Sequence, residues 1–260
     1  MPSIRTVTVT RYVTPLREGG SLPAIVEADD DGMYVLKFRG AGQGPKVLVA
    51  ELISGGIARA LGLRVPEIVF VELDAELART EPDPEIQDLI RASGGLNLGL
   101  DYLPGSISFD PVVDEVDGRL ASRIVWFDAL VSNVDRTARN TNMLIWHGNL
   151  WLIDHGSTLY FHHADDHFLH RSRDPFALIA NHVLLDRADA LEEVDEDMRG
   201  LLTRAAIEEI VGLVPDEWLE GGVDRPPPDE LRAQYVEYLA QRIEHSHHFV
   251  QEAVRARGAL

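Results

Sequence analysis

Apolar and polar residues alternate at the start of the chain, which is the pattern of half-buried β-strands. Between Ile4 and Val13 the apolar side chains alternate with Thr and Arg, and two shorter apolar runs, Ala24–Val26 and Met33–Phe38, flank an Asp-Asp-Asp-Gly turn. A two-residue period gathers apolar side chains on one face of a sheet. We therefore predict an antiparallel sheet near the N-terminus.

The period becomes helical after a glycine-rich break at Gly40–Gly44. From Val47 to Leu61 apolar residues recur at helical spacing, and Gly62 ends the pattern, as glycine commonly does beyond the last turn of a helix. Three further elements are predicted in this part of the chain: a strand over 68–73, a helix over 84–92 and a strand over 96–103.

Beyond residue 103 the pattern is mainly helical. Apolar spacing predicts a helix over 119–134 and a final helix over 229–257. Between them, two apolar runs over 143–146 and 150–153 are joined by His147-Gly148-Asn149, which is the signature of a hairpin. We predict an α+β fold of two lobes, with a sheet and a helix in residues 1–103 and a mainly helical lobe in residues 104–260.

Composition narrows the classes of protein to consider. The 260 residues are 45% hydrophobic, enough for a proper core, and contain no cysteine for disulfides or thiolate metal sites. There is no apolar run long enough to span a membrane and no basic and apolar leader, so we expect a cytoplasmic protein without a membrane partner. The formal net charge of −19 repels polyanions and argues against nucleic acid as a partner.

The most informative residues lie around the predicted hairpin. Asp135 and Asn140 are five positions apart, and Asp154-His155-Gly156 follows the hairpin. Phosphoryl transfer needs a carboxylate that orients and deprotonates the attacking hydroxyl, and oxygen ligands for the Mg²⁺ on the nucleotide phosphates. The hairpin returns the chain, so we expect Asp154 beside Asn140 with room for a metal ion between them.

This constellation resembles the catalytic and metal motifs of HipA-like kinases. The matching residues are Asn133–Asn140 and Leu152–Gly156, and the resemblance extends in order from residue 19 to residue 156. Phosphatidylinositol kinases have a similar D-R-x-x-x-N arrangement. The resemblance implies the two-lobed fold of protein kinases, with ATP and Mg²⁺ as cofactors.

The resemblance also implies roles for single residues. Asp135 corresponds to the catalytic base, and Asn140 and Asp154 correspond to the magnesium ligands. Thr137 stands where the family usually has the histidine of D-R-H, so no imidazole is expected there. Toxin members carry an extra N-terminal segment that contacts an antitoxin. This sequence resembles a short form without it, so the resemblance implies the kinase core and does not imply a toxin–antitoxin role.

Two residues of the N-terminal part complete the predicted catalytic set. Lys37 lies on a predicted strand and Glu51 on the helix that follows, which is the context of the lysine that grips the ATP α- and β-phosphates and of its glutamate partner. Taken alone, each would be an ordinary surface residue. Their order relative to Asp135 makes us assign both to the active site.

Further residues are predicted to contact the nucleotide. The backbone of Gly19-Gly20-Ser21 could lie over the phosphates, because glycine permits close approach, and Ser21 is a candidate autophosphorylation site. A second glycine-rich loop contains Gln43, and Asp101 and Leu103 lie where kinases place the hinge that binds adenine through backbone groups.

Other conspicuous residues receive structural interpretations. The His- and Asp-rich segment 162–170 has no recognised metal-ligand spacing, so we interpret it as a solvated loop on the substrate side. Trp146 and Trp151 are assigned to the core. Arg136 is interpreted first as a helix cap or a carboxylate partner and second as a contact for the transferring phosphate.

The acceptor is left open between a protein and a small molecule. We expect transfer of the γ-phosphate to a hydroxyl acceptor, foremost a protein Ser or Thr. One alternative is a small-molecule kinase of the aminoglycoside or choline phosphotransferase type, since an acidic lobe suits a cationic substrate. Another is a degenerate nucleotide-binding module, which the retention of Lys37, Asp135, Asn140 and Asp154 argues against. The sequence has no H-E-x-x-H, G-x-S-x-G or Walker A motif.

Overall fold

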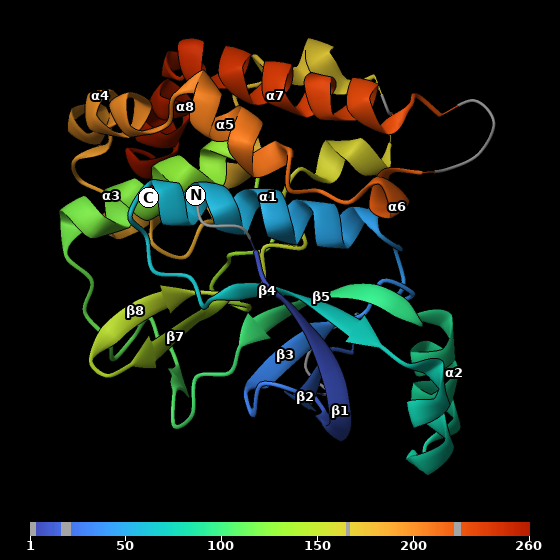
Figure 1. The fold of residues 1–260 in the computed structure, drawn as a ribbon. Coiled ribbons are helices and arrows are strands. Elements are labelled where there is room, and N and C mark those ends of the chain that lie inside the picture. Colours follow the sequence, from blue (N-terminus) through green and yellow to red (C-terminus); the bar gives the residue numbers. More distant parts are fainter. Residues whose placement is uncertain (1–3, 17–21, 165–166, 221–224) are drawn as a thin grey trace.

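The computed structural model describes residues 4–16, 22–164, 167–220 and 225–260. A β-barrel carries the N-terminal strands, and a layer of helices packs above it (Figure 1). The barrel strands follow the spatial order β1-β2-β3-β5-β4. They are β1 (Thr6–Pro15), β2 (Ala24–Ala28), β3 (Met33–Lys37), β4 (Ile68–Leu73) and β5 (Gly95–Asp101).

The barrel closes through one parallel pair, which differs from the antiparallel sheet predicted from the sequence. Thr6–Thr8 of β1 pairs in parallel with Phe70–Glu72 of β4, whereas the other neighbouring strands are antiparallel. Irregularities in the register of β1 with β2 lie between Val9 and Arg11 and between Tyr12 and Thr14. Such bulges bend a strand, so β1 can pair with β2 over one half and reach β4 with the other. The alternation of apolar and polar residues predicts that a segment is a strand, but it does not determine which strands pair with it.

The barrel has a hydrophobic core of its own. Inward side chains such as Val26, Leu36 and Val71 pack together, and α2 (Pro84–Ala92) adds Ile86 and Ile90 to this cluster. The 3₁₀ helix η1 (Ala75–Thr80) connects β4 to α2. Both α2 and β4 have the bounds that the sequence predicted.

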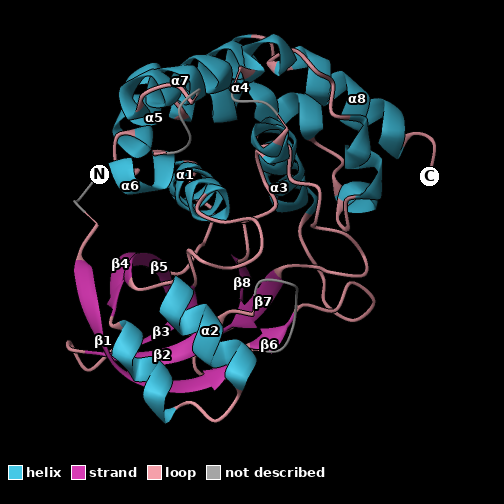
Figure 2. Ribbon diagram, turned by 90° about the vertical axis from the view of Figure 1, so that its right-hand side faces the viewer, coloured by secondary structure: helices cyan, strands magenta, loops and turns pink. Residues whose placement is uncertain are grey.

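Helix α1 (Lys46–Ala60) lies between the barrel and the helices α5 (Arg204–Val211) and α7 (Pro228–Glu244) (Figures 1 and 2). Its apolar side chains belong to the larger core, which also contains the C-terminal helices. Two adjacent glycines allow close packing on both sides: a Cβ on Gly55 would lie 2.7 Å from Ile68 Cδ1 of β4, and one on Gly56 would lie 2.8 Å from Ile210 Cγ2. The helix therefore joins the barrel to the helical layer.

The helical layer and a small sheet form the rest of the molecule. The helices are α3 (Gly118–Leu130), α4 (Leu191–Leu201), α5 (Arg204–Val211), α6 (Asp216–Leu219), α7 (Pro228–Glu244) and α8 (His247–Arg257). The sheet has the order β6-β7-β8 and consists of β6 (Ile107–Ser108), β7 (Met143–Trp146) and β8 (Asn149–Leu152). Four short 3₁₀ helices follow β8: η2 (Tyr160–His163), η3 (Phe168–Arg171), η4 (Ala177–Asn181) and η5 (Leu185–Arg187).

Two predicted helices end earlier than their apolar patterns suggest. The helix predicted over 119–134 stops at Leu130, because the buried guanidinium of Arg242 binds the carbonyl oxygens of Ala129 and Leu130 at 2.6 and 2.7 Å and Ser132 adopts a positive φ of 53°. The predicted final helix is divided into α7 and α8 at His245 and Ser246. In both places a tertiary contact or a turn overrides helical spacing.

No helix within the described ranges is long and apolar enough to cross a bilayer.

Candidate active site

Lys37 and Asp154 meet although they are far apart in the sequence. Lys37 Nζ lies 2.5 Å from Asp154 Oδ1 and 3.4 Å from Glu51 Oε2. Lys37 ends strand β3, Glu51 lies on α1, and Asp154 follows strand β8. The predicted lysine, glutamate and hairpin aspartate are therefore brought together.

Glu51 is fully buried and has partners on two sides. Its Oε1 accepts hydrogen bonds from the backbone N–H of His155 at 3.0 Å and lies 3.2 Å from His155 Nδ1. Burial alone would raise the pKa of Glu51, but Lys37 and His155 lower it to about 2. Burial also opposes the charge on Lys37, yet the carboxylates of Glu51 and Asp154 raise its pKa above the usual value. Both groups are therefore ionised at neutral pH.

The backbone around Asp154 is shaped for this contact. Asp154 has a positive φ of 54°, an uncommon conformation for a residue other than glycine. The preceding residue, Ile153, donates its N–H to the carbonyl of Asn142 at 3.0 Å. A Cβ on Gly156 would lie 2.7 Å from Val47 Cγ1, so only glycine lets this loop pass so close to α1.

Asp135 lies in the loop between α3 and β7 and is held from several directions. Its Oδ2 accepts hydrogen bonds from Asn140 Nδ2 at 2.8 Å and Asn142 Nδ2 at 3.3 Å, and its backbone N–H donates to Asn133 Oδ1 at 3.0 Å. Partial burial raises the pKa of Asp135, and the charge of Asp154 raises it further, against the hydrogen bonds of the two asparagines. The two carboxylates are thus close enough to repel each other.

A cleft of about 510 Å³ lies between the barrel and the loop over residues 131–142, which carries Asp135 and Asn140. Its lining includes Lys37 and Val35 from β3, Asp101 and Leu103 from the segment after β5, and Asn140, Asn142 and Asp154. The cleft therefore joins five of the predicted site residues, whereas Asp135 and Glu51 are not among the described residues that line it and reach it through Asn140 and Lys37.

The predicted hinge leaves one amide for a ligand. The N–H of Asp101 donates to Glu67 O at 2.8 Å and that of Tyr102 to Met33 O at 2.9 Å. Within the described residues, the N–H of Leu103 has no hydrogen-bond acceptor. Because Leu103 lines the cleft, this amide is the free backbone donor of the segment.

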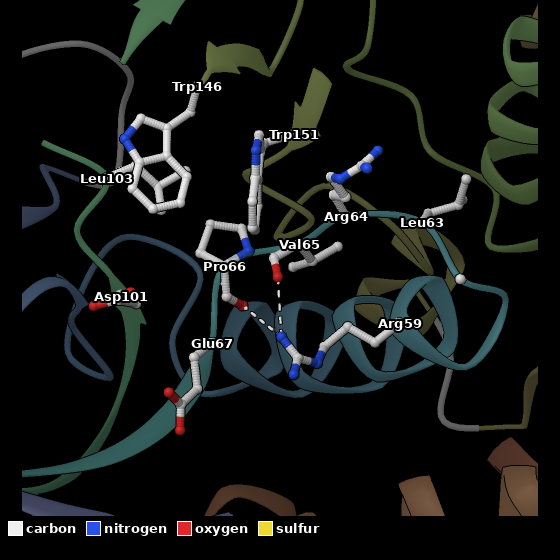
Figure 3. A pocket seen from close by; sticks show the side chains of 11 residues that line it. Arg59, Leu63, Arg64, Val65, Pro66, Glu67, Asp101, Leu103, Trp146 and Trp151 are labelled. Carbon is white, nitrogen blue, oxygen red and sulfur yellow. Dashed lines mark hydrogen bonds between the residues drawn. The ribbon is translucent and has the colours of Figure 1, made fainter. Parts of the chain in front are cut away.

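A second cavity, of about 400 Å³, lies next to the predicted hinge (Figure 3). It shares Pro66, Asp101 and Leu103 with the cleft. Trp146 and Trp151 form part of its wall, with ring centroids 5.3 Å apart. The prediction that both tryptophans are core residues is wrong, because both line this cavity and are only half-buried.

Several predicted residues lie elsewhere. Gly19, Gly20 and Ser21 are outside the described residues. Gln43 lies in the turn before α1 and is not among the described residues that line the cleft. Arg136 is buried and paired with Asp128 at 2.6 Å, which agrees with its interpretation as a carboxylate partner.

The solvated loop predicted over 162–170 is wrong for His162. This side chain is fully buried, with Nδ1 2.8 Å from the Tyr235 hydroxyl of α7 and Nε2 3.1 Å from His163 Nε2. Lys46 Nζ contacts its carbonyl oxygen. The histidine-rich pattern resembles that of a surface loop, but η2 turns this side chain toward α7.

The comparisons with known proteins agree with this geometry. A family model described as HipA-like kinase matches residues 9–252. The chain belongs to the HipA-like kinase family. Its members are kinases, and this protein is accordingly a kinase. No curated protein sequence matches the chain.

Solved structures show the same fold for this HipA-like kinase. The proinflammatory kinase CtkA of Helicobacter pylori matches with a TM-score of 0.52 and 13% identity over 100% of both chains. The Golgi casein kinase with Mn and ADP bound matches with a TM-score of 0.53 and 13% identity, covering 99% of this chain and 75% of that one. A second structure of the Golgi casein kinase has a TM-score of 0.51, with 13% identity over 99% of this chain and 74% of that one.

Four residues around the site of this kinase were missed from the sequence. Asn142 could have been recognised as a second asparagine two positions after Asn140. No sequence pattern points to the other three, Asp128, His182 and Arg242, because each binds a partner distant in the sequence.

Proposed function

We propose that the chain transfers the γ-phosphate of ATP, with Mg²⁺, to the hydroxyl of a protein Ser or Thr. The observation that carries this proposal is the convergence of Lys37, Glu51 and Asp154 next to the cleft that Asn140 also lines. In this proposal residues 1–103 form a nucleotide-binding lobe and residues 104–260 a catalytic lobe.

The donor set suits a hard divalent cation. Asn140 directs its Nδ2 to Asp135, so its Oδ1 is left as a ligand, and Asp154 uses only Oδ1 for Lys37. We therefore assign Asn140 and Asp154 as protein ligands of Mg²⁺. Because no group of three His, Cys, Asp or Glu side chains within the described residues could hold a metal ion, nucleotide phosphate oxygens complete the shell in this proposal. The Golgi casein kinase, whose structure contains Mn and ADP, supports this use of a metal and a nucleotide.

The remaining contacts place the nucleotide along the cleft. We assign the free N–H of Leu103 as donor to the adenine ring and Lys37 as the cation for the α- and β-phosphates. The ion pair with Glu51 holds Lys37 in position, since a buried ammonium without a carboxylate would be costly. When bound, Mg²⁺ neutralises charge on the phosphates.

Asp135 is assigned as the general base. It accepts the proton of the acceptor hydroxyl while the hydroxyl oxygen forms a bond to the γ-phosphorus, and the bond from that phosphorus to the β–γ bridging oxygen breaks to release ADP. Its raised pKa makes it a stronger base than an exposed aspartate. Asn140 and Asn142 orient the carboxylate. The name of the Golgi casein kinase supports a protein as acceptor.

Radiolabelled ATP tests this function. Purified protein, Mg²⁺ and γ-labelled ATP are incubated with a fractionated lysate of the source organism, with an aminoglycoside and with choline. We expect label on Ser or Thr of a protein, abolished by chelation and reduced about 10²- to 10⁴-fold in Asp135→Ala, while that variant still binds ATP. Label found only on the aminoglycoside or on choline would contradict a protein acceptor and indicate a small-molecule kinase. If no acceptor receives the label, the proposed transfer is contradicted and a nucleotide-binding module without transferase activity is favoured.

A further inference from the structure

A buried ionic network lies directly beneath the catalytic loop. Asp128 of α3 is fully buried; its Oδ2 accepts hydrogen bonds from Arg136 Nε at 2.6 Å and His182 Nε2 at 2.8 Å, and its Oδ1 accepts one from Asn133 Nδ2 at 2.8 Å. Burial alone would raise the pKa of Asp128, but Arg136, His182 and Asn133 hold it well below the usual range. The carboxylate is therefore ionised, and its partners come from the catalytic loop and from the segment after η4.

The hydrogen bonds fix the tautomer of His182. Its Nδ1 lies 3.0 Å from the backbone N–H of Leu184. A backbone N–H can only donate, so Nδ1 carries the lone pair and Nε2 carries the hydrogen that points to Asp128. The imidazole thus joins the backbone at Leu184 to the carboxylate beneath the loop.

The network holds both sides of Asp135. Asn133 donates to Asp128 and accepts the N–H of Asp135, whereas Arg136 donates to Asp128 and contacts the carbonyl of Asn142. The segment that carries His182 also pairs with this loop through its backbone, since Val183 N–H donates to Arg136 O at 3.1 Å and Thr137 forms a bridge with His182. Movement at His182 would therefore be transmitted to the residues on either side of Asp135.

We propose that His182 is a positioning residue which, through Asp128, holds Asp135 in its productive orientation. The segment between η4 and η5 then controls the chemical step without touching the nucleotide or the acceptor. This inference rests on the proposed function of Asp135 as base. Buried polar groups of this kind are strongly coupled, because losing one donor leaves the carboxylate short of a partner.

Two amide variants separate the two hydrogen bonds of His182. In His182→Gln the side-chain NH₂ can reach Asp128 as Nε2–H does. In His182→Asn the shorter side chain can offer its oxygen to the N–H of Leu184 but leaves Asp128 without that donor. His170→Gln is the matched control, since His170 is exposed.

Steady-state turnover is measured with Mg²⁺, ATP and dephosphorylated casein as probe acceptor. We expect kcat of His182→Asn to fall about 10- to 100-fold with the KM for ATP unchanged, and His182→Gln to recover most of the loss. Equal losses in both variants, or a change in the KM for ATP alone, would overturn the positioning role. The proposed function is tested separately in the same assay: it holds if the wild type phosphorylates casein and the Asp135→Ala variant does not.

Amide hydrogen exchange provides a readout that does not depend on turnover. Exchange over residues 133–142 should quicken in His182→Asn, return toward wild type in His182→Gln and stay unchanged in His170→Gln. If residues 133–142 exchange alike in all proteins, His182 does not hold the loop, whether or not casein is phosphorylated.

Discussion

At the scale of single residues, the charge state of each buried ionisable side chain in this kinase is set by its immediate partners. Glu51 and Asp128 are both fully buried, and both stay ionised because cationic or N–H donors surround them. His162 is the opposite case. Burial lowers its pKa well below the usual value, and His163, Lys46 and Arg225 add to the effect. The neutral form of His162 is therefore the one built into the fold.

This state of His162 predicts acid sensitivity. A histidine in the unfolded chain takes up a proton near pH 6.5, whereas folded His162 does not, so the unfolded state binds more protons below that pH. The free energy of unfolding should fall by about 1.4 kcal/mol per pH unit for this group as pH decreases below about 6.5. Urea unfolding of wild type and His162→Gln at several pH values measures it. We expect the variant to lose less stability on acidification; parallel pH profiles would contradict the assignment.

At the scale of elements, α1 is the part whose position governs the site. It carries Glu51, and it is fixed to the loop after β8 by Glu51 with His155 and by Ser54 Oγ with Thr158 Oγ1 at 2.6 Å. Gly55 and Gly56 let it approach β4 and α5. The helix is therefore packed from both sides, and displacement would break contacts with the barrel and with the helices together.

Substitution of Gly56 tests this packing. A methyl group there would lie 2.8 Å from Ile210 Cγ2, which cannot turn away easily because the χ1 angle of a β-branched residue is restricted in a helix. We expect Gly56→Ala to lower the free energy of unfolding by about 1–3 kcal/mol. Gly200→Ala in α4 is the control: nothing lies within 4 Å of its Cβ, so it should gain about 0.5–1 kcal/mol. Chemical denaturation compares them, and a stabilised Gly56→Ala would show that α1 is loosely packed.

At the scale of the whole molecule, the cleft is where the barrel faces the small sheet of β6, β7 and β8 and the loops that flank it. Lys37 and Leu103 lie on the barrel side, and Asn140 and Asp154 on the other. In the proposed function one nucleotide with its metal contacts both sides at once. Such a ligand binds only the folded chain and so stabilises it by mass action.

Nucleotide should therefore raise the melting temperature in a metal-dependent way. At about a hundredfold excess over Kd the gain is about 2.7 kcal/mol, which corresponds to an increase of about 5–10 °C for a chain of this size. We expect a smaller shift with ATP and chelator, and Asp154→Ala should lose the Mg²⁺-dependent part alone. Mg²⁺ without ATP is the control. The same shift with and without metal would remove Asp154 from the metal site.

Much of the local structure was predictable because it depends on neighbours in the sequence. The bounds of β4 and α2, the hairpin of β7 and β8 and the order of Lys37, Glu51 and Asp154 follow from periodicity, turn residues and motif spacing. The parallel closure of the barrel and the break between α7 and α8 did not follow, because strand partners and helix ends depend on contacts between distant segments.

The sequence by itself predicted which residues would carry the chemistry, since residue types and motif spacing are properties of the chain alone. The tertiary structure alone decided how those residues are held. His182 reaches Asp128, and Arg242 ends α3, through bonds between positions far apart in the chain. Such partners have no sequence spacing to reveal them, because folding, and not chain order, sets the distance between them.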